Sequence, residues 1–146
     1  MTEEKFMDLK RVLFLCTGNS ARSQMAEGLL RHLAGDKFEV FSAGVRPTQL
    51  NPLAIKVMSE IGIDISKQKS KSIKEFFGQQ FDYVITVCNN AKQTCPAFPG
   101  KYGKIHWKLE DPAEVQGSEE DKTKFFREIR NKIDKKIKKF LMKDKS

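Results

Sequence analysis

The stretch that most constrains the fold is VLFLCTGNSARSQMAEGLL, which runs from Val12 to Leu30. Its four leading apolar residues are typical of a strand buried on both faces, and the run stops on Cys16. Small and turn-permissive residues follow, and from Ser23 onward apolar residues recur at helical spacing until Gly35. A buried strand therefore leads through a short polar loop directly into a helix.

The rest of the chain repeats this alternation. Further strands are predicted at three places: residues 38–44, 83–88 and 104–107. Two more helices are predicted, one over residues 51–62 with Asn51 as its cap, and one from Glu119 to Leu141. The apolar stripe of the last helix consists of Phe125, Phe126, Ile129, Ile133, Ile137 and Leu141. We expect a single α/β domain over residues 1–146, with a central, mostly parallel sheet of about four strands and helices on both faces.

Composition narrows the class of protein. The net charge of +8 is concentrated in the last helix, where lysines alternate with acidic residues. Because no nucleic-acid-binding motif accompanies this charge, we interpret it as a solvated helix face and expect no nucleic-acid partner. No apolar run is long enough to span a membrane, and the N-terminus lacks a signal-peptide pattern, so a cytoplasmic monomer is expected.

The chain has three cysteines, Cys16, Cys88 and Cys95, and two histidines. An odd number of cysteines without a secretion signal argues against a static disulfide framework. A structural zinc site would need four good ligands, which these residues do not supply at a suitable spacing. We therefore expect neither a metal nor a cofactor.

The loop after the first strand carries the chemistry. Between Cys16 and Arg22 lie five small or turn-permissive residues: Thr17, Gly18, Asn19, Ser20 and Ala21. Such a loop can direct successive backbone N–H groups at an anion, and the following helix adds the positive end of its dipole. Arg22 can grip two oxygens of a tetrahedral oxyanion, and Ser23 can donate a hydrogen bond to a Cys16 thiolate. The alternative is a buried cysteine beside an unrelated arginine, but the strand–loop–helix context favours an oxyanion site.

The sequence VLFLCTGNSARS resembles the phosphate loop of the low-molecular-weight protein tyrosine phosphatase superfamily. Asp111-Pro112 in KLEDPAE matches the late Asp-Pro that this family uses for its general acid. The resemblance implies the family's α/β fold, Cys16 as nucleophile, oxyanion binding by residues 17–23 including Arg22, and Asp111 as general acid.

A second resemblance bears on the reaction. VITVCNNAKQTCPAFPG, with SQMAEG and SAG, resembles the thioredoxin-coupled arsenate reductases of this superfamily. It implies that Cys16 attacks arsenate, that Cys88 then attacks Cys16, and that Cys95 moves the disulfide to Cys88–Cys95 for reduction by thioredoxin. The first alternative is a tyrosine phosphatase in which Cys88 and Cys95 only protect Cys16. The second is a non-catalytic oxyanion-binding module, which the combination of Cys16, Arg22 and Asp111 disfavours.

Some of these reductases bind potassium through an Asn, a Glu, a Ser and a later Asp. Asn19, Glu27 and Ser42 match the first three, but Lys71 stands where the acidic residue would fall. Because a lysine opposes a bound cation, we expect no potassium dependence. Asn19 and Ser42 are expected to brace the loop by hydrogen bonds instead.

Overall fold

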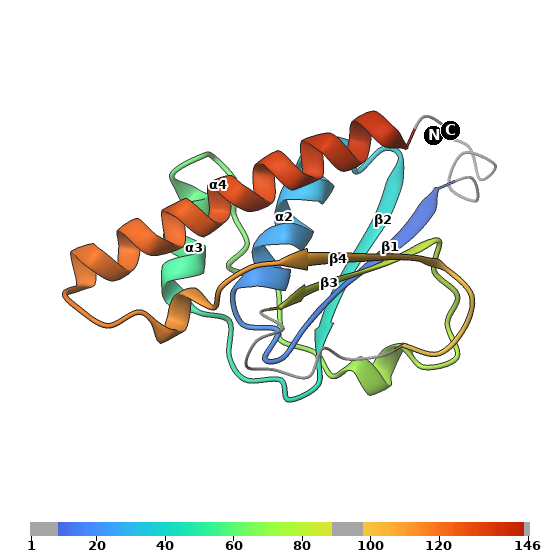
Figure 1. The fold of residues 1–146 in the computed structure, drawn as a ribbon, viewed down its shortest axis with the longest axis horizontal. Helices are drawn as coiled ribbons and strands as arrows, with labels where there is room; N and C mark the ends of the chain where they lie inside the picture. The colour runs from blue at the N-terminus through green and yellow to red at the C-terminus, as the bar shows by residue number, and fades with distance from the viewer. Residues whose placement is uncertain (1–8, 89–97, 145–146) are drawn as a thin grey trace.

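The computed structural model describes residues 9–88 and 98–144, and its elements carry the labels of Figure 1. Four strands form one sheet in the order β2-β1-β3-β4. Their bounds are β1 Lys10–Cys16, β2 Phe38–Gly44, β3 Tyr83–Cys88 and β4 Gly103–Lys108. All three described strand pairings are parallel, so the predicted parallel sheet of four strands is confirmed.

Helices cover both faces of the sheet, as predicted, but unequally. The three described α-helices are α2 Arg22–Ala34, α3 Pro52–Ser59 and α4 Glu119–Lys143. They share one core with the face of the sheet that carries Val12, Phe14 and Ile85. The opposite face, with Leu13, Leu15 and Val84, packs against the 3₁₀ helix η1 Ile73–Phe76 and nearby phenylalanines. Figure 1 shows α4 lying along the sheet, on the same side as α2 and α3.

Helix α3 begins as its sequence predicts but ends earlier. The Asn51 side chain accepts a hydrogen bond from the Leu53 N–H at 2.8 Å, which confirms the predicted cap. The helix stops at Ser59 instead of continuing to Gly62, because Gly62 adopts a φ of 80°. This left-handed turn brings the Ile63 N–H back to the Met58 carbonyl at 3.0 Å and returns the chain to the core.

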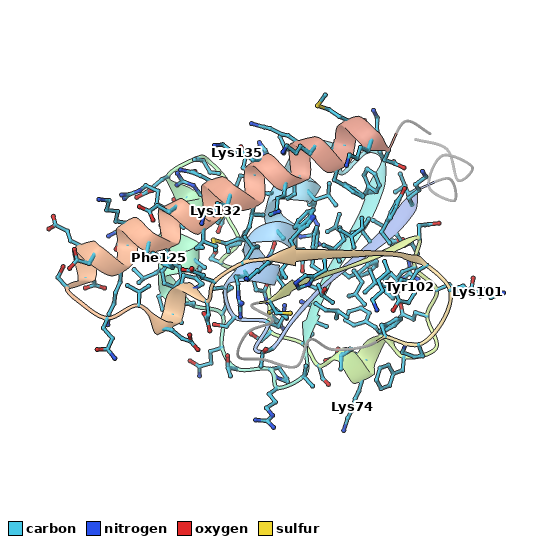
Figure 2. All side chains as sticks on the ribbon, viewed as in Figure 1. Lys74, Lys101, Tyr102, Phe125, Lys132 and Lys135 are labelled. Carbon is cyan, nitrogen blue, oxygen red and sulfur yellow. The ribbon has the colours of Figure 1, made fainter. Side chains whose placement is uncertain are left out.

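Helix α4 buries the middle of the predicted apolar stripe, but Phe125 at its start, like Leu141 at its end, is only partly buried. Phe126, Ile129, Ile133 and Ile137 are buried as expected, whereas Leu141 is only partly buried. Phe140 takes the last core position because its ring packs against Phe38 and Tyr83, with centroids 5.6 and 4.9 Å away. Lysines including Lys132 and Lys135 occupy the exposed face (Figure 2). Within the described residues, no helix has the length and apolarity needed to cross a membrane.

An ion-pair cluster fastens α4 to the end of α3. Glu60 accepts hydrogen bonds from Arg127 at 2.6 and 2.8 Å and from Arg130 at 3.0 Å. The hydrogen bonds from Arg127, with further help from Arg130, lower the pKa of Glu60 to about 2. A carboxylate with a depressed pKa stabilises the fold above its unfolded-state pKa, and this contribution fades as pH falls toward the folded-state value.

We expect Glu60→Gln to lower the free energy of unfolding at pH 7 by about 1 kcal/mol, since the partly exposed cluster is screened by solvent. The difference from wild type should shrink as pH falls from about 4.5 toward about 2. Urea unfolding at pH 7, 4 and 3 measures this. Glu128→Gln, at an exposed position of α4, is the control and should change stability by less than about 0.5 kcal/mol. A deficit in Glu60→Gln that stays constant with pH would show that the ion pairs are not its cause.

Candidate functional site: a thiol in a cradle of backbone amides

The site lies at the carboxyl ends of the central strands. β1 ends on Cys16, and the neighbouring β3 ends on Cys88. The chain leaves β1 toward β2 on one side and reaches β3 on the other, so this edge is the switch point of the sheet, where ligands of open α/β folds bind. Both cysteines are buried there, as their predicted positions at strand ends required.

The loop that follows Cys16 is held from outside through its carbonyl groups. Four of these carbonyls accept N–H groups from the segment after β2: Cys16 from Val45, Thr17 from Arg46, Gly18 from Thr48 and Ser20 from Asn51, at 2.8–3.3 Å. A planar trans peptide directs its C=O and N–H in opposite senses. The amides of residues 17, 18, 19 and 21 therefore point away from that segment, and the Asn19 N–H among them contacts the Cys16 sulfur. The predicted cradle of amides follows from this hydrogen bonding.

The Cys16 sulfur receives two defined contacts. The Asn19 N–H donates to it at 3.1 Å, and Ser23 Oγ lies 2.8 Å away. The Asn19 side-chain amide donates to Ser23 Oγ at 2.8 Å, so this hydroxyl already accepts a hydrogen bond. Its own proton is consequently available for the sulfur, and a Cys16 thiolate can only accept. When Cys16 is a thiolate, Ser23 is therefore the donor of this contact.

Asn19 organises the loop. It is fully buried with a φ of 48°, a left-handed conformation that asparagine tolerates better than most residues. Its Oδ1 accepts from the Lys71 N–H at 2.8 Å and from Gln24 at 3.1 Å. Its Nδ2 donates to Ser42 at 2.9 Å as well as to Ser23. The expected bracing of the loop by Asn19 and Ser42 is confirmed.

Arg22 joins the loop to the segment after β4. Its guanidinium donates to the Leu109 carbonyl at 2.9 Å and lies 3.8 Å from the Asp111 carboxylate. Asp111 in turn accepts the Ala113 N–H at 3.0 Å and caps the 3₁₀ helix η2 Pro112–Glu114. These contacts bring Asp111 to the same opening as Cys16, although the two are distant in sequence.

A cavity of about 320 Å³ opens over the thiol. It is lined by Cys16, Thr17, Gly18, Ser20, Ala21, Arg22, Arg46, Thr48, Asp111 and Ala113. Thr17 Oγ1 is buried and has no hydrogen-bond partner among the described residues. A tetrahedral oxyanion in this cavity would meet the Arg22 guanidinium, the loop amides and this hydroxyl.

Sequence reasoning missed Arg46 and Thr48. Both follow β2, whose carboxyl end lies at the same edge of the sheet as Cys16, because Cys16 is in register with Gly44. That shared edge is the signal that could have found them. The predicted redox residue Cys95 lies outside the described residues.

The polar groups behind the loop do not fit a potassium ion. Asn19 Oδ1 already accepts two N–H groups, and Ser42 Oγ donates to Glu27 Oε1. The Lys71 ammonium lies 3.8 Å from that same carboxylate oxygen. A side-chain cation thus already compensates the Glu27 carboxylate. Within residues 9–88 and 98–144, no group of three or more His, Cys, Asp or Glu could hold a metal ion.

A parallel α/β domain with a cysteine thiol inside an amide cradle, an adjacent arginine and a nearby Asp-Pro defines a class of thiol-dependent proteins that bind tetrahedral oxyanions. Residues 11–146 match the family model described as low molecular weight phosphotyrosine protein phosphatase, and the chain belongs to this family.

Relatives within the family share a more specific description. An arsenate reductase of Halalkalibacterium halodurans is 47% identical over 92% of this chain and 96% of its own length. The structure of an arsenate reductase in the phosphate binding state has a TM-score of 0.79 and 34% identity, covering 92% of this chain and 98% of that one. A thioredoxin-dependent arsenate reductase of Corynebacterium glutamicum has a TM-score of 0.70 and 33% identity, covering 92% of this chain and 61% of its own.

Gly44 is where the cradle tolerates no side chain. A Cβ built there would lie 2.7 Å from both the Asn19 nitrogen and the Thr17 carbonyl oxygen. We therefore expect Gly44→Ala to displace the loop and to weaken phosphate binding at least about tenfold, the equivalent of one lost charged hydrogen bond. Isothermal titration calorimetry with inorganic phosphate measures this.

Gly62→Ala is the matched control. It strains a left-handed residue in open space, so it should cost about 1 kcal/mol of stability and leave phosphate affinity unchanged. Equal phosphate affinities of Gly44→Ala and wild type would contradict the predicted role of this close approach.

Proposed function

We propose that this protein reduces arsenate to arsenite, with Cys16, Cys88 and Cys95 passing a disulfide that thioredoxin finally reduces. The observation that carries the proposal is the Cys16 sulfur at the centre of the amide cradle, with Cys88 at the end of the adjacent strand. The relatives described above as arsenate reductases, one of them thioredoxin-dependent, support the same reaction.

In the first step, the Cys16 thiolate attacks the arsenic atom of arsenate and forms a sulfur–arsenic bond. The amides of residues 17–23 and Arg22 hold the arsenate oxygens, and the unpartnered Thr17 hydroxyl donates to one of them. Asp111 protonates the oxygen that leaves as water. The contact of Asp111 with Arg22 supports this role, since it keeps the carboxyl group at the opening of the cavity.

In the second step, the Cys88 thiolate attacks the sulfur of Cys16. A disulfide forms, and the electron pair of the broken sulfur–arsenic bond stays on arsenic, which departs as arsenite. The register supports this step, because Leu15 pairs with Thr86 and Cys88 lies one residue beyond the position level with Cys16. At normal strand spacing their Cα atoms are about 6 Å apart, within the reach of a disulfide.

The third step frees Cys16 for another cycle. Cys95 attacks Cys88, Cys16 leaves as a thiolate, and the dithiol of thioredoxin reduces the resulting Cys88–Cys95 disulfide. Val87 shares a core cluster with Cys16, and side chains alternate along a strand. The end of β3 must therefore rotate for the Cys88 sulfur to reach Cys16 in the second step, and it can rotate back when the third step releases Cys16.

The second candidate function is hydrolysis of phosphotyrosine by Cys16, Arg22 and Asp111, with Cys88 and Cys95 as protecting thiols. Membership of the phosphatase family favours it, because a phosphate ester and arsenate present similar tetrahedral oxyanions to the loop. Under the first proposal, slow hydrolysis of aryl phosphates is expected as a side activity.

Replacing Cys95 separates the two functions. With thioredoxin, thioredoxin reductase and NADPH, wild type should consume NADPH in response to arsenate, and Cys95→Ser should lose this turnover while still hydrolysing p-nitrophenyl phosphate. The reason is that only reduction needs the third thiol. If neither protein responds to arsenate and both hydrolyse the ester equally, the protein is a phosphatase.

Replacing Asp111 tests the general acid. Asp111→Asn retains the oxygen that caps η2 but offers no acidic proton, so p-nitrophenyl phosphate hydrolysis should fall about 100-fold in kcat with little change in KM. Stopped-flow or steady-state assays at 405 nm measure both constants. Glu110→Gln, the exposed acidic neighbour, is the control and should keep wild-type kcat. An unchanged kcat in Asp111→Asn would remove this residue from the mechanism.

A further inference from the structure

A buried carboxylate that the proposed reaction does not use is connected to the nucleophile. Glu27, on α2 one turn beyond Ser23, is 4% exposed. Its Oε1 accepts from Ser42, which accepts from the Asn19 amide, which also donates to Ser23. Ser23 in turn contacts Cys16. A continuous series of hydrogen bonds therefore runs from Glu27 to the reactive sulfur.

The direction of this series is set at the carboxylate. A carboxylate only accepts hydrogen bonds, so the Ser42 proton is committed to Glu27 and the Ser42 lone pairs face Asn19. Asn19 must then present its NH₂ group to Ser42 and Ser23, while its oxygen faces the Lys71 N–H. Ser23 is left with its proton for Cys16. The carboxylate of Glu27 and the two N–H groups on Asn19 Oδ1 thus favour the same orientation, in which Ser23 keeps its proton for a Cys16 thiolate.

A buried carboxylate is costly unless a cation accompanies it. Two cations reach Glu27, but they do so differently. Arg31 binds Oε2 at 2.6 Å with a side chain that is half exposed. Lys71 is three-quarters buried and lies 3.8 Å from Oε1, the oxygen that Ser42 uses.

Hydrogen bonds also hold the backbone and the ammonium group of Lys71. Its N–H donates to Asn19 Oδ1 at 2.8 Å, and its carbonyl accepts from Gly44 at 2.9 Å. Its ammonium donates to the Lys69 carbonyl at 2.6 Å, which aims the side chain along its own segment toward Glu27. One residue therefore contacts both Asn19 and Glu27 in the series.

We propose that Lys71 is a positioning residue for the Cys16 nucleophile: its ammonium compensates Glu27 at Oε1 and thereby fixes the orientation of Ser42, Asn19 and Ser23. The proposal rests on the proposed function only in taking Cys16 as nucleophile, because hydrolysis would need the same thiolate. On this proposal, the cation that compensates Glu27 is a side chain of the protein itself.

The consequence for kinetics is specific. Without the ammonium, Ser23 loses its fixed orientation toward the sulfur, whereas the loop amides and Arg22 still bind the oxyanion. Lys71→Met should therefore reduce kcat for p-nitrophenyl phosphate about tenfold and change KM less than about threefold. Lys71→Arg, which keeps the charge, should restore most of kcat. Lys74→Met, which removes a lysine that projects from η1 into solvent (Figure 2), is the matched control and should match wild type.

A second measurement reports the hydrogen bonds directly and does not depend on activity. The Asn19 side-chain NH₂ group donates two buried hydrogen bonds, so its protons should exchange slowly with solvent in NMR spectra of wild type, Lys71→Arg and Lys74→Met. In Lys71→Met the exchange should be at least about tenfold faster, while the Ile85 backbone amide in the central sheet keeps its rate. Glu27→Gln should produce the same change, and adding Lys71→Met to it should change little more.

The outcomes separate the two proposals. Unaltered Asn19 exchange in Lys71→Met, or faster exchange at Asn19 and Ile85 alike, would overturn the positioning role. If Lys71→Met does not fold, Lys71→Gln is measured in its place and judged by the same comparison. Failure of the proposed function would appear separately, as a wild type that does not respond to arsenate while Asn19 exchange still depends on Lys71.

Discussion

The hydrogen bonds between the loop carbonyls and the segment after β2 are the constraint on which the site depends. They fix the direction of each of these C=O groups. The N–H group of the same planar trans peptide must then point the opposite way. Asn51 extends the constraint, because its N–H binds the Ser20 carbonyl while its side chain caps α3. The loop is thereby tied to a helix that is itself packed in the core. Gly44 must be glycine for the loop and β2 to approach this closely.

Much of the fold could be predicted because periodicity records burial. The continuous apolar run before Cys16 identifies a strand covered on both faces, and the stripe of α4 identifies its core face. Periodicity could not choose between Phe140 and Leu141, which are neighbours on the helix. The choice depends on aromatic contacts with Phe38 and Tyr83, which come from distant parts of the chain. The early end of α3 likewise depends on the turn at Gly62.

The site could be predicted where one short segment contains its chemistry, as in residues 16–23. The proximity of Asp111 to Arg22 was expected only from the family resemblance, because it depends on how β4 leads into η2. Irregular segments without periodicity contain Arg46, Thr48 and Lys71. Their positions depend on how these segments are held beside the end of β2. From the sequence, Lys71 argued against a bound potassium ion. That its ammonium lies near the Glu27 carboxylate could be seen only in the structure.

The strand order has a consequence for how such a protein can change its chemistry. The anion cradle follows β1, whereas Cys88 follows β3, and the segments that fasten the cradle come from β2, α3 and the region around Lys71. Cys88 therefore lies beside the cradle without being part of its scaffold. Substitutions at the end of β3 would therefore alter the proposed disulfide relay without touching the contacts that hold the loop after Cys16. The proposed reduction and the alternative hydrolysis would in this architecture share Cys16 and differ in their need for the end of β3.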